Sequence, residues 1–319
     1  MKKINFILFI LFFNLLTACS SKTSDRYREG NNKGQKSALT VEEEKKLTQD
    51  ALKDMKKEYP PVNHPALQAY INQLGQKLVQ ANNLHHKPYT YSFTVVDTPA
   101  VNAFALPAGS IFITTPIIAM AETEAEIAGV LGHEIGHVTA RHTAERMYVA
   151  KKEQTKTIAF GAIGAAVLGT AGYYASKKLC AEKDLECKAK LIGGGAAAGA
   201  MGGLFVQKYS FMKNSQEDEL ESDRVGFRYA TNAGYDKEKV GDFYKKLQMM
   251  EKEAKKGQSG AMLWLSDAMA SHPSSNLRVS QAEEMKGLIQ KSGGTAVTLE
   301  FLKMKKIASD MVAKHKNHK

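Results

Sequence analysis

VLGHEIGHVTARH, residues 130–142, contains two histidines four residues apart, with a glutamate directly after the first. On an α-helix, positions i and i+4 lie one turn apart on the same face, so His133 and His137 can direct their imidazoles at one point, as a zinc ion requires. Glu134 points about 100° away from His133 and can reach a water molecule at the metal. The stretch therefore predicts a helix that binds zinc, with Glu134 as general base.

The alternative is a polar helix face that carries this pattern by chance. With nine histidines and 33 acidic residues among 319, the pattern is expected about 0.03 times. Apolar residues also surround the polar ones, which indicates a helix packed in the core with its histidines facing a cleft. These residues are Val130, Leu131, Ile135 and Val138.

A catalytic zinc site needs a third protein ligand and an open position for water. The chain continues after Val138 as TARHTAER, which lacks a histidine at the metzincin spacing. His142 follows His137 by five residues, so it is expected at the helix end and away from the metal-facing side. The third ligand is therefore expected to be a carboxylate on another helix. The candidates are Glu217, Asp218, Glu219, Glu221 and Asp223, although a solvated acidic face would look the same.

The first residues, MKKINFILFILFFNLLTACSS, have the features of a secretory signal. Two lysines precede an apolar run from Phe6 to Leu16, which is too short for a comfortable transmembrane helix. Leu16-Thr17-Ala18-Cys19 then resembles the bacterial lipobox, so residues 1–18 are predicted to be cleaved and Cys19 to carry lipid. The alternative is an ordinary signal peptide cut near Ala18.

A serine rather than an aspartate follows Cys19, which resembles the residue that sends lipoproteins to an outer membrane. The sequence thus predicts a protein of the bacterial cell envelope, anchored by lipid on the periplasmic face of the outer membrane. Residues 19–39 are polar and contain Gly, Ser and Lys, so they predict a flexible tether from the lipid to the domain.

Removal of residues 1–18 takes away Lys2 and Lys3, so the formal net charge falls from +11 to +9. No nucleic-acid partner is expected, because the chain is exported and has no helix-turn-helix, zinc-finger or aromatic RNA-binding pattern. The basic charge indicates a surface that faces anionic lipid headgroups. The alternative is that the lysines are scattered over solvated helix faces and bind no partner. Basic residues cluster in residues 292–319, which predict a basic C-terminal tail.

Cys180 and Cys187 remain as an even pair in an oxidising compartment, and a disulfide between them is one interpretation. In a continuous helix their Cα atoms would lie about 10 Å apart, beyond the roughly 7 Å limit for a bridge. A bridge therefore requires a turn at Lys183-Asp184, and two free thiols are the alternative.

The sequence predicts that residues 40–291 form one domain. Thr40 with Glu43 forms a capping box, so a first helix is expected from there to about Tyr59. Further patterns predict a second amphipathic helix in the stretch 60–83, strands at YTYSFTVVD (89–97) and GSIFITT (109–115), a helix from about Glu122 to Arg146, another ending at Gly234, and two more in residues 237–254 and from about Ser275.

Two Ala/Gly-rich segments lie within residues 157–206. Small residues at close spacing let two helices approach tightly, so this region predicts a helical hairpin inserted in the domain, with the cysteines at its tip. A transmembrane hairpin is the rival interpretation, which the weak insertion energy of Ala and Gly disfavours.

Five motifs together resemble metallopeptidase family forty-eight, and most closely its bacterial periplasmic lipoprotein members. The resemblance covers about residues 40–290 and implies an α+β, mostly helical fold, a zincin-type (gluzincin) metalloprotease domain with a small β-sheet. The motifs are NAFALPAG (102–109), EAEIAGVLGHEIGH (124–137), ELESDRVG (219–226), NAGYD (232–236) and SHP (271–273) with Arg278.

The resemblance also implies the ligand set. In that family the zinc-binding glutamate stands four residues before an aspartate, which corresponds to Glu219 and Asp223 here, with Ser222 where alanine is usual. Zinc is then bound by His133, His137 and Glu219, and Asp223 can hydrogen-bond a histidine ligand because it lies one turn from Glu219. Glu217 and Glu221 fall on other faces of the helix and are expected at the surface.

His272 corresponds to the family's SHP histidine, which lies near the metal and either stabilises the oxyanion or occupies the open position at rest; a turn histidine before proline is the alternative. Asn102 and Arg278 are weaker candidates for positioning substrate or the loop. Residues 110–115 are expected to form an edge strand that receives an extended peptide.

The sequence thus favours a zinc-dependent endopeptidase that cleaves envelope proteins, with polypeptides as partners and quality control of misassembled outer-membrane proteins as its role. The alternative is a chaperone or assembly lipoprotein that uses the same cleft for binding without proteolysis. The intact His133-Glu134-Ile135-Gly136-His137 motif argues against that alternative.

Overall fold

A computed structural model describes residues 32–86, 88–149, 152, 214–255, 272, 276–290 and 293–317. The predictions for the signal peptide, the lipid on Cys19, the Ala/Gly-rich hairpin and the Cys180–Cys187 pair lie outside the described residues. Among the residues that are described, no helix has both the length and the hydropathy needed to span a membrane.

Helices make up most of the described chain, so the prediction of a mostly helical α+β domain with a small sheet is confirmed. The helices are α2 (Val41–Glu58), α3 (Pro65–Ala81), α4 (Thr115–Met120), α5 (Glu124–Thr139), α8 (Gln216–Asn232), α9 (Lys237–Val240), α10 (Asp242–Lys255), α12 (Asn276–Leu288) and α13 (Leu299–Asn317), with 3-10 turns η1 (Leu84–His86) and η2 (Pro107–Gly109).

A three-stranded mixed sheet has the order β1-β3-β2. β1 (Ser92–Val96) pairs parallel with β3 (Ser110–Thr114), and β2 (Ala103–Ala105) pairs antiparallel with β3. The prediction that residues 110–115 form an edge strand is therefore wrong, because β3 is the central strand. β2 has only three residues, too few to show the alternation that reveals a strand in a sequence.

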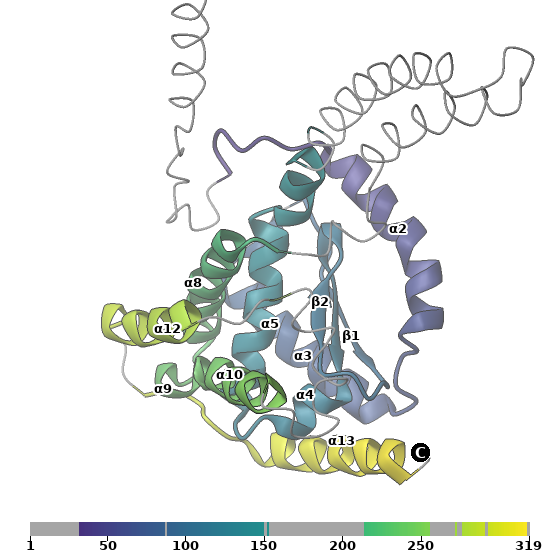
Figure 1. Cartoon of the computed structure of the whole chain (residues 1–319), viewed down its shortest axis with the longest axis vertical. Coiled ribbons are helices and arrows are strands. Elements are labelled where there is room, and N and C mark those ends of the chain that lie inside the picture. Colours follow the sequence, from purple (N-terminus) through teal and green to yellow (C-terminus); the bar gives the residue numbers. More distant parts are fainter. Residues whose placement is uncertain are drawn as a thin grey trace, which may run out of the picture.

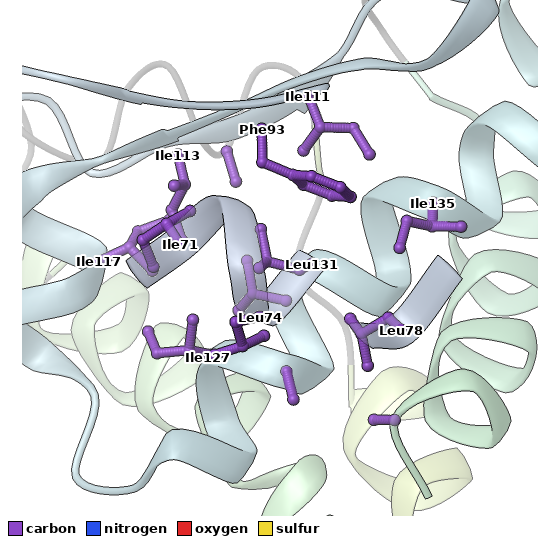
Figure 2. Packing of buried hydrophobic residues seen from close by; sticks show 14 of the residues in the cluster. Ile71, Leu74, Leu78, Phe93, Ile111, Ile113, Ile117, Ile127, Leu131 and Ile135 are labelled. Carbon is purple, nitrogen blue, oxygen red and sulfur yellow. The ribbon is translucent and has the colours of Figure 1, made fainter. Parts of the chain in front are cut away.

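Side chains alternate across the sheet and build two apolar layers. Phe93 of β1 and Ile111 of β3 belong to the main core, with buried residues of α3 and α5 such as Leu78 and Ile135 (Figure 2). On the opposite face, Phe104 stacks on Phe112, with ring centroids 4.9 Å apart, and Leu52 of α2 packs against this second cluster. Figure 1 shows α2 covering this face of the sheet while α3 and α5 lie on the other.

The first helix begins as its capping box predicts. The backbone N–H of Glu43 donates to Thr40 Oγ1 at 3.2 Å, and the backbone N–H of Thr40 donates to Glu43 Oε2 at 2.7 Å. The last helix differs from expectation, because α13 packs against α4 and buries Phe301 and Ala308 completely. Most of the predicted basic tail is therefore part of the packed domain.

Glycines allow α5 and α8 to pack with their backbones nearly in contact. A Cβ atom at Gly132 would lie 2.6 Å from the carbonyl oxygen of Gly226, and one at Gly226 would lie 2.4 Å from the backbone nitrogen of His133. Real Cβ atoms do not come this close, so a larger residue at either position would push the helices apart. This packing brings the acidic side chains of α8 to the histidines of α5.

The predicted helix from 122 to 146 is interrupted. α5 ends at Thr139, Arg141 has a left-handed φ of 55°, and the chain is helical again over residues 142–149. Side chains from the segment before α2 satisfy the carbonyl groups freed at this break: Asn32 donates to the oxygen of Thr139 at 2.8 Å, and Gln35 to that of Ala140 at 2.6 Å.

Candidate metal centre

Three predicted ligands meet between α5 and α8. His133 Nε2 and His137 Nε2 lie 2.9 Å apart, and the two carboxylate oxygens of Glu219 face them, with Oε2 3.4 Å from His133 Nε2 and Oε1 3.3 Å from His137 Nε2. Four ligands at zinc's usual bond length of about 2.1 Å would stand roughly 3.4 Å apart at the corners of a tetrahedron. All three side chains are buried, and their nitrogen and oxygen donors suit a zinc ion once the two histidine nitrogens open slightly.

Arg278 of α12 binds the two carboxylates of the centre. Its guanidinium donates to both oxygens of Asp223, at 2.7 and 2.6 Å, and its Nη1 lies 2.7 Å from Glu219 Oε2. Asp223 in turn lies 2.7 Å from His133 Nδ1, the ring nitrogen opposite the metal-facing one. Arg278 therefore orients two carboxylates, one expected on the metal and one behind a ligand.

The electrostatics favour a cation at this place. Burial raises the pKa of the Glu219 carboxyl, but the neighbouring His272 and Arg278 outweigh it and hold that pKa well below its ordinary value. Burial is the largest single influence on His133 and lowers its pKa, but the charges of Glu219 and Asp223 together outweigh it and raise that pKa to about 9. Burial and the charge of His133 together keep the pKa of His137 well below normal. Without metal, the centre thus holds the ionised carboxylate of Glu219 and an extra proton on His133, and zinc would displace that proton.

Glu134 lies beside the cluster and is not part of it. Its side chain is buried, and among the described residues its Oε2 has no hydrogen-bond partner. Burial raises the pKa of this carboxyl above its ordinary value, opposed by His272 and His133. A buried carboxylate with one unpaired oxygen and a raised pKa is suited to accept a proton and return it.

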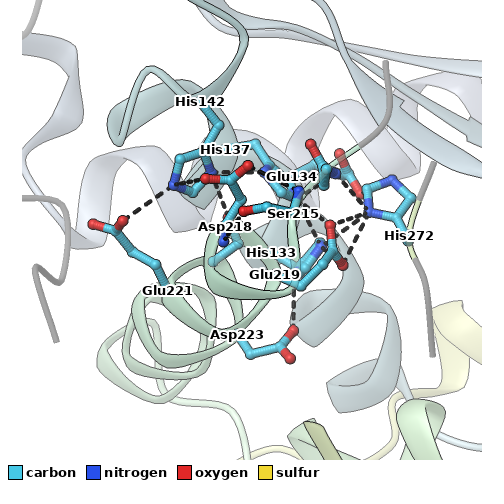
Figure 3. A network of polar contacts seen from close by, with 12 residues as sticks. His133, Glu134, His137, His142, Ser215, Asp218, Glu219, Glu221, Asp223 and His272 are labelled. Atoms are coloured by element: carbon cyan, nitrogen blue, oxygen red, sulfur yellow. Dashed lines mark hydrogen bonds and ion pairs between the residues drawn. The ribbon is translucent and has the colours of Figure 1, made fainter. Parts of the chain in front are cut away.

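His272 completes the polar cluster (Figure 3). Its Nδ1 lies 3.0 Å from Glu219 Oε1 and 3.3 Å from His133 Nε2, so it stands where a fourth ligand would be. Its Nε2 lies 3.1 Å from the carbonyl oxygen of Ala103 in β2 and 3.5 Å from Glu134 Oε1. One imidazole therefore touches the ligand set, the general base candidate and the edge of the sheet.

Asn214 also enters the centre, and nothing in the sequence pattern pointed to it. Its Nδ2 lies 3.2 Å from both His137 Nε2 and His272 Nδ1, and among the described residues its buried Oδ1 has no partner. It directly precedes Ser215, whose capping box with Asp218 starts α8. That box was a readable signal for the helix start, but not for the side chain before it.

The surroundings of His137 differ from expectation at two residues. His142 is not among the grouped metal donors, in line with its expected place off the metal-facing side, but it is fully buried and its Nδ1 lies 2.8 Å from His137 Nδ1. Glu221 was expected at the surface, yet it is 5% exposed and its Oε2 lies 3.1 Å from His142 Nε2. The interruption of the helix at Arg141 turns His142 back toward α8. A continuous helix would not bring His142 to this position. Glu217 is exposed as expected.

The sheet edge next to the centre is β2. The other outer strand, β1, already pairs through Val95 and Asp97 with residues 60–62. A hollow runs along β2 beside Glu134, His137 and Asn214. A second hollow has a largely apolar lining next to His133 and Glu134. Its other lining residues include Val101, Asn102, Ile117, Val130, Phe243 and Leu247.

The model of peptidase family M48 matches residues 65–286 of this chain. The beta-barrel assembly-enhancing protease of Escherichia coli is 28% identical over 211 residues, which cover 66% of this chain and 39% of that protein. The mitochondrial metalloendopeptidase OMA1 of Arabidopsis thaliana is 30% identical over 61% of this chain and 31% of its own length. That of Schizosaccharomyces pombe is 26% identical over 77% and 62%. The chain thus spans well under half of the first of these relatives.

Proposed function

Because this chain belongs to peptidase family M48, we propose that it is a zinc-dependent endopeptidase of the bacterial envelope whose substrates are misfolded or misassembled outer-membrane proteins. The observation that carries the proposal is the buried, unpaired Oε2 of Glu134 beside the ligands His133, His137 and Glu219. A binding protein has no use for a general base at a metal, whereas a hydrolase needs one. The Escherichia coli relative is a beta-barrel assembly-enhancing protease, which supports the choice of substrate class.

When bound, zinc would polarise the scissile carbonyl and lower the pKa of the attacking water. The chain's own residues do the rest. Glu134 accepts the proton of that water through its free oxygen and delivers it to the leaving amine. Burial around Glu134 keeps bulk water away and raises the pKa of the carboxyl, which makes the carboxylate a better acceptor for that proton.

The substrate backbone is expected to pair with the outer edge of β2, which has no strand partner among the described residues and replaces residues 110–115 as the peptide-binding strand. The carbonyl oxygen of Ala103 is an acceptor on this edge, where His272 now donates to it. His272 therefore has to move for a peptide to pair there and for water to take the fourth corner of the metal. The apolar hollow beyond His133 suits an aliphatic or aromatic side chain next to the scissile bond.

Mapping the cleaved proteins tests this proposal. Envelope proteins would be compared by proteomics between cells that express the wild-type chain and cells that express Glu134→Gln. We expect new termini in outer-membrane proteins in the wild-type cells alone, with an apolar residue beside the cleaved bond. Termini confined to other classes of protein would contradict the substrate proposal, and an absence of new termini would contradict proteolysis itself.

We further propose that a lipid on Cys19 anchors the enzyme, since the lipobox-like stretch precedes a polar tether. Cys19→Ala removes the acylated atom, so the chain is expected to move from the membrane fraction to the soluble fraction of lysed cells, as measured by immunoblotting. Wild-type protein is the control. A variant that stays with the membrane would reject the lipid anchor and point to residues 157–206 as the attachment.

A further inference from the structure

The two histidine ligands are supported in different ways. Behind His133, Asp223 lies directly at Nδ1, at 2.7 Å. Behind His137 there is no carboxylate within reach among the described residues; instead His142 Nδ1 lies 2.8 Å from His137 Nδ1 (Figure 3). Behind His142, Oε2 of Glu221 lies 3.1 Å from Nε2.

The positions of the protons follow from these contacts. His137 faces the ligand cluster with Nε2, so this nitrogen needs a lone pair for the metal and the ring proton belongs on Nδ1. That proton points at His142 Nδ1, which must then accept it. The proton of His142 therefore lies on Nε2, where the carboxylate of Glu221 accepts it.

We propose that His142 and Glu221 position His137 as a metal ligand, with the carboxylate acting through the intervening imidazole. The chain of contacts fixes the tautomer and the ring orientation of His137, as a directly bonded carboxylate does for other metal ligands. This inference rests on the metal centre and not on the choice of substrate. It assigns a positioning role to two side chains that contact no zinc and no peptide.

The surroundings of His142 support a specific arrangement. The ring is fully buried, and a buried imidazole is costly unless both nitrogens are paired. Other polar groups are less well placed: Ser222 Oγ lies 3.3 Å from Nδ1, and Asp218 Oδ1 lies 3.8 Å from Nε2. Asp218 also faces Arg146, at 3.5 Å. Glu221 is therefore the group that sets the tautomer of His142.

Zinc affinity of the full chain tests the role, by competition with a chromophoric chelator. His142→Phe fills a similar volume but has no ring nitrogen, so zinc binding is expected to weaken about 10- to 100-fold. Glu221→Gln is expected to weaken binding in the same direction. Glu217→Gln, on the exposed face of the same helix, is the matched control and should bind like wild type.

Two readouts separate positioning from mere packing. His142→Gln offers an amide oxygen to His137 and an amide N–H to Glu221, so it should recover part of the affinity that His142→Phe loses. Unfolding of the zinc-free chains reports stability apart from the metal. Equal affinities for His142→Phe and wild type would overturn the proposal.

The wild-type chain provides a test that needs no folded variant. Imidazole ¹⁵N shifts in the zinc-loaded protein are expected to show a proton on Nδ1 of His137 and on Nε2 of His142. A proton on Nδ1 of His142 would overturn the proposal that His142 accepts the proton of His137. A wild-type chain that binds no zinc would instead reject the metal centre, so the two failures are distinguishable.

Discussion

Glu134→Gln is expected to keep zinc bound and to reduce peptide hydrolysis by about 10²- to 10⁴-fold, near the upper end, because the same side chain takes and returns the proton. Glutamine preserves size and polarity but cannot accept a proton. The loss should appear in kcat, since Glu134 is not a ligand and contributes little to holding the peptide. Cleavage of casein or of an unfolded outer-membrane protein, with zinc measured by atomic absorption, would check it.

The same variant separates the enzyme from the alternative chaperone. A chaperone that uses the cleft for binding would be unaffected by the loss of a general base. If the wild-type chain cleaves nothing while Glu134→Gln fully restores envelope integrity in a deletion strain, binding rather than proteolysis is the function. Exposed Glu217 supplies the control, and Glu217→Gln should cleave at the wild-type rate.

Glu219→Gln is expected to lose most of the bound zinc. Its carboxylate supplies one of three ligands and the negative charge that attracts the cation, and an amide oxygen replaces neither. Loss of a side chain that merely supports a ligand lowers metal affinity about 10- to 100-fold. Loss of a ligand itself should therefore lower zinc affinity by more than roughly 100-fold. Zinc content after dialysis and chelator competition would measure this.

The controls for this prediction are the neighbouring acidic residues. Glu217→Gln should retain full zinc, whereas Glu221→Gln should show the smaller loss expected of a side chain acting through His142. Full zinc in Glu219→Gln, with loss in Glu217→Gln, would contradict the ligand assignment. Because Arg278 also bonds Glu219, unfolding of the zinc-free variant should be recorded alongside.

Local patterns in the sequence were enough to predict several features. The i, i+4 histidines required a helix with one metal-facing side, and His133 and His137 lie together as predicted. The capping box at Thr40 marked the start of α2. These features depend on neighbours within one helical turn, so the sequence contains all of their determinants. Choosing Glu219 among five acidic residues needed the family motif as well.

The tertiary structure decided what depends on distant segments. The edge strand is β2 rather than residues 110–115, because strand order depends on how the chain pairs across the sheet. His142 reaches His137 because α5 ends at Thr139, where Asn32 and Gln35, more than a hundred residues away, cap its carbonyl groups. A helical period carried through the break pointed His142 elsewhere, since a periodic pattern cannot register a backbone turn stabilised from another part of the chain.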